Sequence, residues 1–158
     1  MRLKAPSALL TIILLMSSPG QAEPAVAENG PAASIPAAAL IQPAELAARL
    51  RNAAAPKPLI LQVGFRILYK ESHIPGSEYV GPAREEAGLQ LLRNRVAKLA
   101  RDSAIVIYCG CCPWQHCPNV AAAYDALHAM GFTHVTVLHI ANNFNDDWVT
   151  QGYPAEHG

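Results

Sequence analysis

The chain of 158 residues lacks any run of basic residues beyond its N-terminus, and its 12 Lys and Arg are balanced by 12 Asp and Glu. Phosphate binding requires a cationic face, so we expect no nucleic-acid partner. Charged residues make up only 15% of the sequence and hydrophobic residues 51%. This composition indicates a globular core rather than a disordered chain, and the length suits one domain.

The sequence also lacks an apolar run of the roughly 20 residues that a bilayer span requires. The apolar run 8–16 follows two basic residues and precedes the small residues Gly20-Gln21-Ala22. This order predicts a signal peptide over residues 1–22, cleaved after Ala22. No cysteine follows the run, so a lipid-modified cysteine is not indicated. We expect a periplasmic or secreted protein with no stable membrane insertion after cleavage.

Cysteine is absent outside residues 109–117, where four of the nine positions carry it: Cys109, Cys111, Cys112 and Cys117. A structural disulfide framework spreads its cysteines along the chain to join distant segments. Four cysteines on one short loop join nothing distant. Their local purpose is sulfur chemistry, redox chemistry or metal binding.

Short apolar runs alternate with amphipathic segments along the chain. The runs predict strands, and the segments with a helical apolar face predict helices. The expected strands are 40–41, 59–63, 103–108 and 135–138, and the expected helices are 43–50, 89–100, 119–130 and 142–150. Residues 23–38, rich in Ala and Pro, are expected to be a flexible lead-in to a domain over 39–156. The alternation predicts an α/β fold with a mainly parallel sheet.

Several segments in this order resemble a single rhodanese domain. They are the turn His73-Ile74-Pro75-Gly76-Ser77, the strand ending in Tyr108-Cys109, the segment from Gly131-Phe132 to Leu138, and Trp148 with Gly152-Tyr153-Pro154. The resemblance runs from about Ile41 to Pro154. It implies a rhodanese-like central sheet of about five strands flanked by helices. It also implies a sulfurtransferase that carries sulfane sulfur as a persulfide on Cys109 and passes it to a thiol or other acceptor.

The chain departs from the rhodanese pattern at three places. Gln62 and Gly64 stand where Asp and Arg usually follow the second strand, and the cysteine loop contains no Lys or Arg. Asn142 and Asn143 replace paired glycines after the last strand, and Asn is well suited to the positive φ that such a turn needs. Because the loop has no cation to bind thiosulfate, a neutral or protein-borne persulfide is a rival sulfur donor.

Cys109 is expected to end a buried strand just before a helix that starts near Pro118. Such a turn directs backbone N–H groups inward and places them near the positive end of a helix dipole. We therefore expect the amides of residues 110–117 to stabilise a thiolate or persulfide on Cys109 and to lower its pKa. Reaction with a sulfur donor then requires only this nucleophile, the anion site and access.

The rest of the loop supplies the remaining candidate residues. Cys112, in a C-x-x-C arrangement with Cys109, is a possible resolving thiol, and His116 is either an acid or base or an exposed loop residue. The expected substrate-binding residues are Gly110, Cys111, Pro113, Trp114, Gln115 and Cys117.

Two other functions stay open at this point. One is a thiol–disulfide oxidoreductase that uses the Cys109/Cys112 pair. The other is a non-catalytic rhodanese module that binds a soft metal, Cu(I) or Zn, or a protein partner. For the sulfurtransferase itself we expect no cofactor and no resident metal. Its partners would be a small sulfur donor, or a protein persulfide or thiol acceptor, and the pattern does not indicate an oligomeric state.

Overall fold

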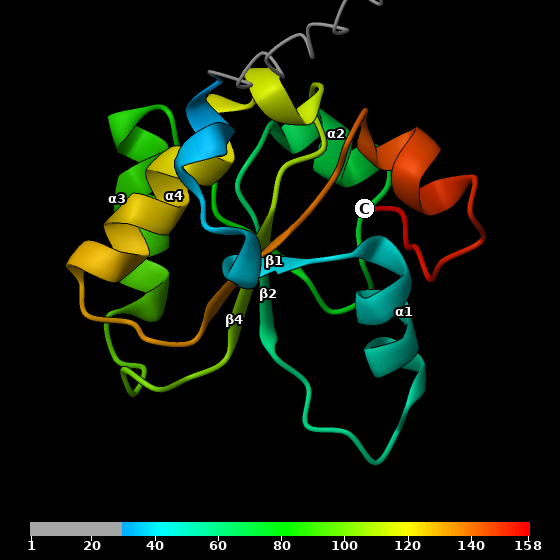
Figure 1. The fold of residues 1–158 in the computed structure, drawn as a ribbon, viewed down its shortest axis with the longest axis horizontal. Coiled ribbons are helices and arrows are strands. Elements are labelled where there is room, and N and C mark those ends of the chain that lie inside the picture. The colour runs from blue at the N-terminus through cyan, green and yellow to red at the C-terminus, as the bar shows by residue number, and fades with distance from the viewer. Residues whose placement is uncertain (1–29) are drawn as a thin grey trace, which may run out of the picture.

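Five short parallel strands form one sheet at the centre of the structure, a computed structural model that describes residues 30–158 (Figure 1). The spatial order of the strands is β1-β5-β4-β2-β3. Their bounds are β1 Leu40–Ile41, β2 Leu59–Gln62, β3 Glu78–Tyr79, β4 Ile105–Tyr108 and β5 Val135–Leu138. The predicted α/β class with a parallel sheet of five strands is confirmed.

The central strand, β4, is buried along its whole length. Its residues are apolar and mostly β-branched, which suits a strand covered on both faces. Ile105 pairs with Leu59 on one side and with Val135 on the other. The sequence pattern missed β3, because a strand of two half-buried residues has no periodicity to detect.

Helices cover both faces of the sheet. They are α1 Pro43–Arg51, α2 Arg66–Glu71, α3 Glu86–Val96 and α4 Pro118–Ala129, with the 3-10 turns Ala37–Ala39 and Trp114–His116 and a π-helical turn Asn145–Val149. Figure 1 shows α3 and α4 on one face of the sheet, and α1 with the turn Asn145–Val149 on the other. Helix α2 lies in a segment whose mixed pattern had predicted no element.

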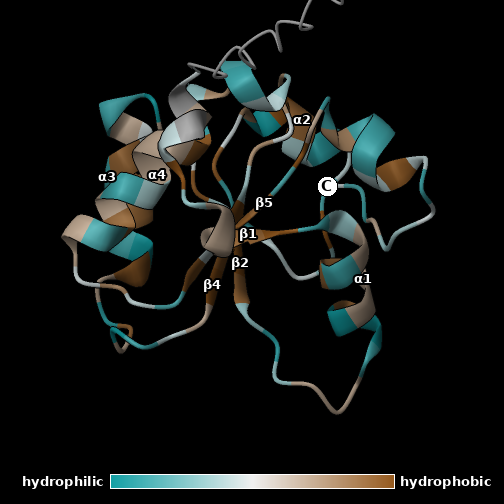
Figure 2. Ribbon diagram, in the orientation of Figure 1, coloured by the Kyte–Doolittle hydropathy of each residue, from teal (hydrophilic) through white to brown (hydrophobic). Residues whose placement is uncertain are grey.

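Two apolar clusters fill the spaces between sheet and helices, because successive strand residues point to opposite faces. Leu61 and Ile107 belong to the cluster under α3 and α4, and Ile60 and Val106 belong to the cluster on the α1 side. Hydrophobic colour accordingly concentrates on the sheet and on the inner faces of the helices (Figure 2). Because all five strands are parallel, their carboxyl ends meet at one edge of the sheet.

The described part of the segment expected to be a lead-in contains two short 3-10 turns. A 3-10 turn, η1, spans Pro31–Ser34 and contacts both α4 and the turn Trp114–His116. Ala32, within this turn, and Ile35, directly after it, are buried in the core, so apolar burial orders this part of the segment. The predicted signal peptide lies outside the described residues. Among residues 30–158, no helix combines the length and apolar character that crossing a membrane demands.

A buried tyrosine ties the turn before β3 to the end of β4. The Tyr108 hydroxyl accepts a hydrogen bond from the Ile74 amide at 3.2 Å and lies 3.1 Å from Ser77 Oγ. His73 stacks on Tyr69, with ring centroids 4.1 Å apart, and its Nδ1 hydrogen-bonds the Tyr69 carbonyl. Burial raises the pKa of the Tyr108 phenol, which stays neutral. These contacts fix the chain on one side of the residue that follows, Cys109.

Candidate functional site

The cysteine loop leaves the sheet at its central strand. Cys109 directly follows β4 and is 3% exposed. Gly110 turns the chain with a φ of +73°, and its carbonyl accepts a hydrogen bond from the Phe144 amide at 3.1 Å. A Cβ at Gly110 would lie 2.6 Å from Phe144 Cβ. Glycine is therefore required here by both the backbone conformation and the close approach of the segment after β5.

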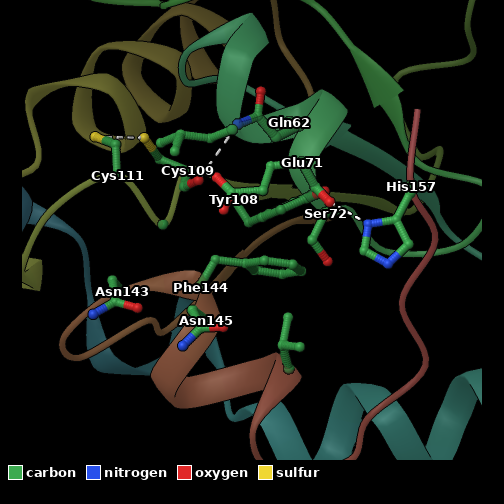
Figure 3. Close-up of a pocket in the computed structure, with 13 residues that line it drawn as sticks. Gln62, Glu71, Ser72, Tyr108, Cys109, Cys111, Asn143, Phe144, Asn145 and His157 are labelled. Atoms are coloured by element: carbon green, nitrogen blue, oxygen red, sulfur yellow. Dashed lines mark hydrogen bonds between the residues drawn. The ribbon is translucent and has the colours of Figure 1, made fainter.

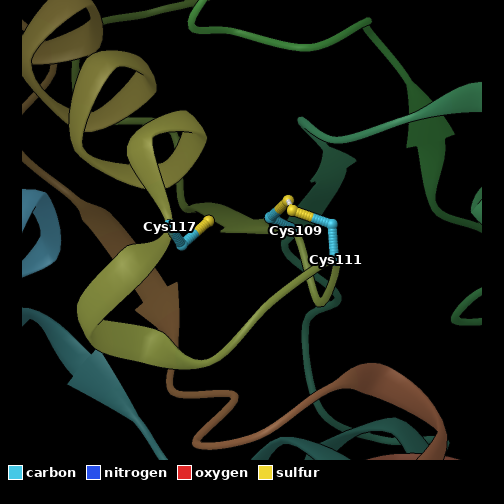
Figure 4. Close-up of side chains that lie close together, drawn as sticks. All are labelled: Cys109, Cys111 and Cys117. Carbon is cyan, nitrogen blue, oxygen red and sulfur yellow. Dashed lines mark hydrogen bonds between the residues drawn. The ribbon is translucent and has the colours of Figure 1, made fainter.

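Three cysteine sulfurs converge at the start of this loop. Cys109 Sγ lies 3.0 Å from Cys111 Sγ, and the sulfurs of Cys109, Cys111 and Cys117 all lie within 4.8 Å of one another (Figure 4). Cys112 Sγ contacts Cys111 Sγ at 3.3 Å and is not part of the three-sulfur group. Each of the four cysteines is a free thiol. The pattern had paired Cys109 with Cys112, whereas the contact in the structure is with Cys111.

Asn119, in the first turn of α4, supports two of these sulfurs. Its Nδ2 donates to Cys109 Sγ at 3.4 Å and lies 3.8 Å from Cys111 Sγ, and its Oδ1 accepts from the Arg84 amide at 3.0 Å. Asn119 is 1% exposed, so its amide is held in one orientation. The sequence pattern did not indicate Asn119 as a site residue. Its position directly after Cys117-Pro118, at a helix start facing the loop, was the available signal.

The residues that replace the usual Asp and Arg also contact Cys109. Gln62 is buried, its Nε2 donates to the Cys109 carbonyl at 3.5 Å, and its Oε1 accepts from the Gly64 amide. A Cβ at Gly64 would lie 2.7 Å from Cys109 Sγ. Gln62 thus holds the backbone of the candidate nucleophile, and the missing side chain at Gly64 leaves room for its sulfur.

The thiols of the cluster are electrostatically unequal. Hydrogen bonding to Cys111 and Cys117, together with burial, raises the pKa of Cys109. Hydrogen bonds from Cys109 and Cys117 lower the pKa of Cys111, which is more exposed than Cys109. The expectation that Cys109 itself has a lowered pKa is therefore wrong. The S–H group that Cys109 donates to Cys111 favours a negative charge on Cys111 over one on Cys109.

The remaining pKa shifts agree with a single thiolate in the cluster. Burial and hydrogen bonding to Cys111 raise the pKa of Cys112. For Cys117, the hydrogen bond with Cys109 favours the thiolate, but Cys111 and burial outweigh it and raise the pKa. Ionising a second thiol next to the first is unfavourable because like charges repel at these distances.

Three amides of the predicted cradle have other partners. The N–H groups of Trp114, His116 and Cys117 donate to the carbonyls of Ala141, Pro113 and Trp114. These three amides are therefore not available to Cys109, because two of them close the 3-10 turn and that of Trp114 bonds to the segment after β5. Asn142 and Asn143 likewise do not adopt the expected turn, since every positive φ among the described residues belongs to a glycine.

A cavity of about 310 Å³ opens beside the cysteines. Cys109 and Cys111 lie at one end and His157 at the other, with Phe144 between them (Figure 3). The lining residues are Gln62, Leu68, Glu71, Ser72, Tyr108, Cys109, Gly110, Cys111, Asn143, Phe144, Asn145, Val149 and His157. The sequence pattern did not indicate most of these lining residues, because they come from segments that are far apart in the chain and meet only in the fold.

Only the first part of the cysteine loop belongs to the cavity wall. Cys109, Gly110 and Cys111 line the cavity, whereas its lining does not include Cys112, Pro113, Trp114, Gln115, His116 or Cys117. The Trp114 ring is buried, with its centroid 4.8 Å from that of His139. His116 is exposed on the same turn. The turn packs against η1 and carries these predicted substrate-binding residues away from the cavity.

Comparisons with known proteins agree with the fold. The model of the rhodanese-like domain matches residues 42–140. A rhodanese-like domain from Anabaena sp. is 23% identical with a TM-score of 0.56, over 76% of this chain and 80% of that one. A Bacillus halodurans protein is 19% identical with a TM-score of 0.56, over 74% of this chain and 75% of that one.

None of the curated proteins compared with the chain matches it. The structural likenesses lie below 25% identity and therefore speak for the fold. The family match covers more than half of the chain and includes β4, the cysteine loop and β5. The chain belongs to the family of rhodanese-like domains.

Proposed function

We propose that this protein is a sulfurtransferase that carries sulfane sulfur as a persulfide on Cys109. Membership of the rhodanese-like family supports the general sulfurtransferase class. The observation that carries the proposal is the position of Cys109. Its thiol lies at the carboxyl end of the central strand, lines a 310 Å³ cavity and has the Cys111 sulfur 3.0 Å away. Ligand sites in open α/β sheets lie at this edge.

Proton transfer within the cysteine pair accompanies the attack of Cys109. The Cys109 thiol donates toward the Cys111 sulfur. Because Cys109 is the weaker acid of the two thiols, its proton passes to the Cys111 thiolate only as the Cys109 sulfur bonds to the donor. This is general-base catalysis at hydrogen-bond distance. The amide of Asn119 donates to Cys109 Sγ and stabilises the charge that develops there.

Sulfur transfer then takes two nucleophilic substitutions at sulfur. The Cys109 sulfur attacks the outer sulfur of a donor R–S–SH, the sulfur–sulfur bond of the donor breaks, and R–S⁻ leaves with its electron pair. The product is Cys109–S–SH. An acceptor thiolate attacks the outer sulfur of this persulfide, takes it as R′–S–SH, and releases the Cys109 thiolate. Neither step requires a metal or an electron carrier.

The lining of the cavity favours a donor without a strong negative charge. Among the described residues that form it, none is Lys or Arg, and Glu71 contributes a carboxylate. A dianion such as thiosulfate would enter without a Lys or Arg partner. Apolar side chains, Leu68, Phe144 and Val149, form much of the remaining wall. We therefore propose an organic or protein-borne persulfide as donor.

Mass spectrometry of the loop peptide tests the proposal. After incubation of the reduced protein with an organic persulfide, we expect a mass gain of one sulfur atom located on Cys109. Cys109→Ser should abolish both this gain and the transfer to an acceptor thiol. Cys112→Ser, outside the cavity lining, is the matched control and should keep the gain. Full transfer by Cys109→Ser would contradict the assignment.

A second candidate function is thiol–disulfide exchange, favoured by the 3.0 Å separation of the Cys109 and Cys111 sulfurs. In this reaction a substrate disulfide would be reduced to two thiols while Cys109 and Cys111 lose two hydrogen atoms and form a disulfide. The geometry favours this pair over the Cys109/Cys112 pair of the sequence pattern. A reversible mass loss of two hydrogen atoms, with no sulfur added by a persulfide donor, would select this function over sulfur transfer.

A further inference from the structure

We propose that Cys109, Cys111 and Cys117 form a three-coordinate binding site for Cu(I). Their sulfurs lie within 4.8 Å of one another and come from two places, the turn after β4 and the residue before α4. Figure 4 shows the Cys117 sulfur directed toward the other two. This inference goes beyond sulfur transfer, because it uses Cys117, for which the proposed reaction has no role.

The spacing of the sulfurs matches a trigonal metal centre. A metal–thiolate bond of about 2.3 Å places the three sulfurs of a planar site about 4 Å apart. The shortest separation here is 3.0 Å, between Cys109 and Cys111, and no separation in the group exceeds 4.8 Å. Binding thus requires the Cys109–Cys111 distance to open by about 1 Å. Cys111 is half-buried and adjoins Gly110, so its side chain is the one free to move.

The donor set selects a soft ion of low coordination number. Thiolates favour Cu(I), Zn²⁺ and iron–sulfur clusters, whereas Mg²⁺ and Ca²⁺ require oxygen ligands. The group contains only sulfur ligands, with no carboxylate or imidazole from the described residues. Structural zinc sites need four ligands. The fourth cysteine, Cys112, contacts Cys111 Sγ at 3.3 Å, but its sulfur is outside the group of three.

The surroundings of the cluster shield a bound ion from water. Cys109 and Cys117 are each 3% exposed, so water has little access to the ion except beside Cys111. Asn119 Nδ2 donates to Cys109 Sγ and lies near Cys111 Sγ, which orients both ligands and offsets the negative charge of the thiolates. Binding releases the remaining thiol protons to solvent.

Metal binding and sulfur transfer exclude each other at this site. A Cu(I) ion bound to Cys109 occupies the sulfur that would carry the persulfide. We therefore expect Cu(I) to protect Cys109 from persulfide formation in proportion to its occupancy. Each activity is measured separately, so failure of metal binding leaves the persulfide assay unaffected, and failure of persulfide formation leaves the binding assay unaffected.

The test is a Cu(I) titration of the reduced full-length protein without oxygen, in competition with the chelator bathocuproine disulfonate. We expect one Cu(I) per chain, and X-ray absorption should show three sulfur neighbours. Loss of a residue that only supports a metal ligand lowers metal affinity by roughly 10- to 100-fold. Cys117→Ser removes a ligand itself and should therefore lower the affinity for Cu(I) by more than that. Cys111→Ser, at a half-buried position, should do the same if Cys117→Ser fails to fold. Cys112→Ser is the matched control and should keep both affinity and sulfur count.

Three results would overturn the site. The first is a stoichiometry below one Cu(I) against the chelator in a folded, fully reduced protein. The second is an equal loss of affinity in Cys112→Ser and Cys117→Ser, which would assign the ligands differently. The third is a spectrum with two or four sulfur neighbours, of which four would indicate a zinc-type site that includes Cys112.

Discussion

The Cys109 thiol donates to the Cys111 sulfur across 3.0 Å, and the two differ in burial and in acidity. Cys109 is buried with a raised pKa, and Cys111 is half-buried with a lowered pKa. The nucleophile and the charge therefore reside on different sulfurs until a proton moves between them. This division of roles leads to the first prediction.

Cys111→Ser should slow the reaction of Cys109 with a persulfide donor at neutral pH by roughly 100-fold, the size of effect that loss of a general base commonly has. Serine keeps the shape but is neutral at this pH. The rate is measured from the mass of the Cys109 peptide against time. Cys112→Ser should change the rate much less. An unchanged rate in Cys111→Ser would show that Cys109 loses its proton by another route.

Substitutions of Asn119 should separate its two hydrogen bonds. Asn119→Ala leaves the Arg84 amide without an acceptor and removes a donor from Cys109, so we expect a loss of about 1–3 kcal/mol in the free energy of unfolding and slower persulfide formation. Asn119→Asp keeps an acceptor for Arg84 but places a carboxylate beside the sulfurs.

Both variants should therefore be slower than the parent protein, and Asn119→Asp should be the slower of the two because like charges repel. Denaturant unfolding and the persulfide assay measure the two effects. A faster Asn119→Asp would contradict the role of the amide as a donor to sulfur.

Gly64→Ala should block loading of Cys109, because the added Cβ would lie 2.7 Å from its sulfur and 3.0 Å from Gln62 Nε2. We expect persulfide formation to fall by about tenfold or more, since overpacking of this size costs about 1–3 kcal/mol. The control is Gly76→Ala, where a Cβ meets no atom within 4 Å but φ is +72°. That variant should lose about 1–2 kcal/mol of stability from backbone strain while keeping its loading.

Glu78 should make a small, pH-dependent contribution to stability. Arg95 Nη2 donates to Glu78 Oε1 at 2.7 Å, and this hydrogen bond lowers the pKa of Glu78. The side chain of Glu78 is 44% exposed and that of Arg95 is 35% exposed. Solvent screening therefore limits the contribution of this ion pair to the free energy of unfolding to about 0.2–1 kcal/mol.

Because the folded pKa is lowered, the contribution is complete above the pKa of the unfolded state and disappears as the pH falls through the folded value. Glu78→Gln should therefore destabilise the protein at pH 7 and match it in strong acid. Unfolding free energies at several pH values check this. A difference that grows toward low pH would contradict it.

The sequence by itself determined the layered fold and the place of the candidate nucleophile. An apolar, β-branched run predicts β4, and the alternation of strands and helices predicts a parallel sheet, so Cys109 had to lie at its carboxyl edge. These features follow from local periodicity and from apolar burial, which the residue pattern records directly.

Only the tertiary structure decided which groups meet Cys109. The positive φ at Gly110 and the packing of Trp114–His116 against η1 set the course of the loop, and that course brings Cys111 and Cys117, rather than Cys112, into one group. Asn119 reaches the cluster from another element. Sequence spacing does not encode these contacts, because they depend on loop dihedrals and on packing between segments far apart in the chain.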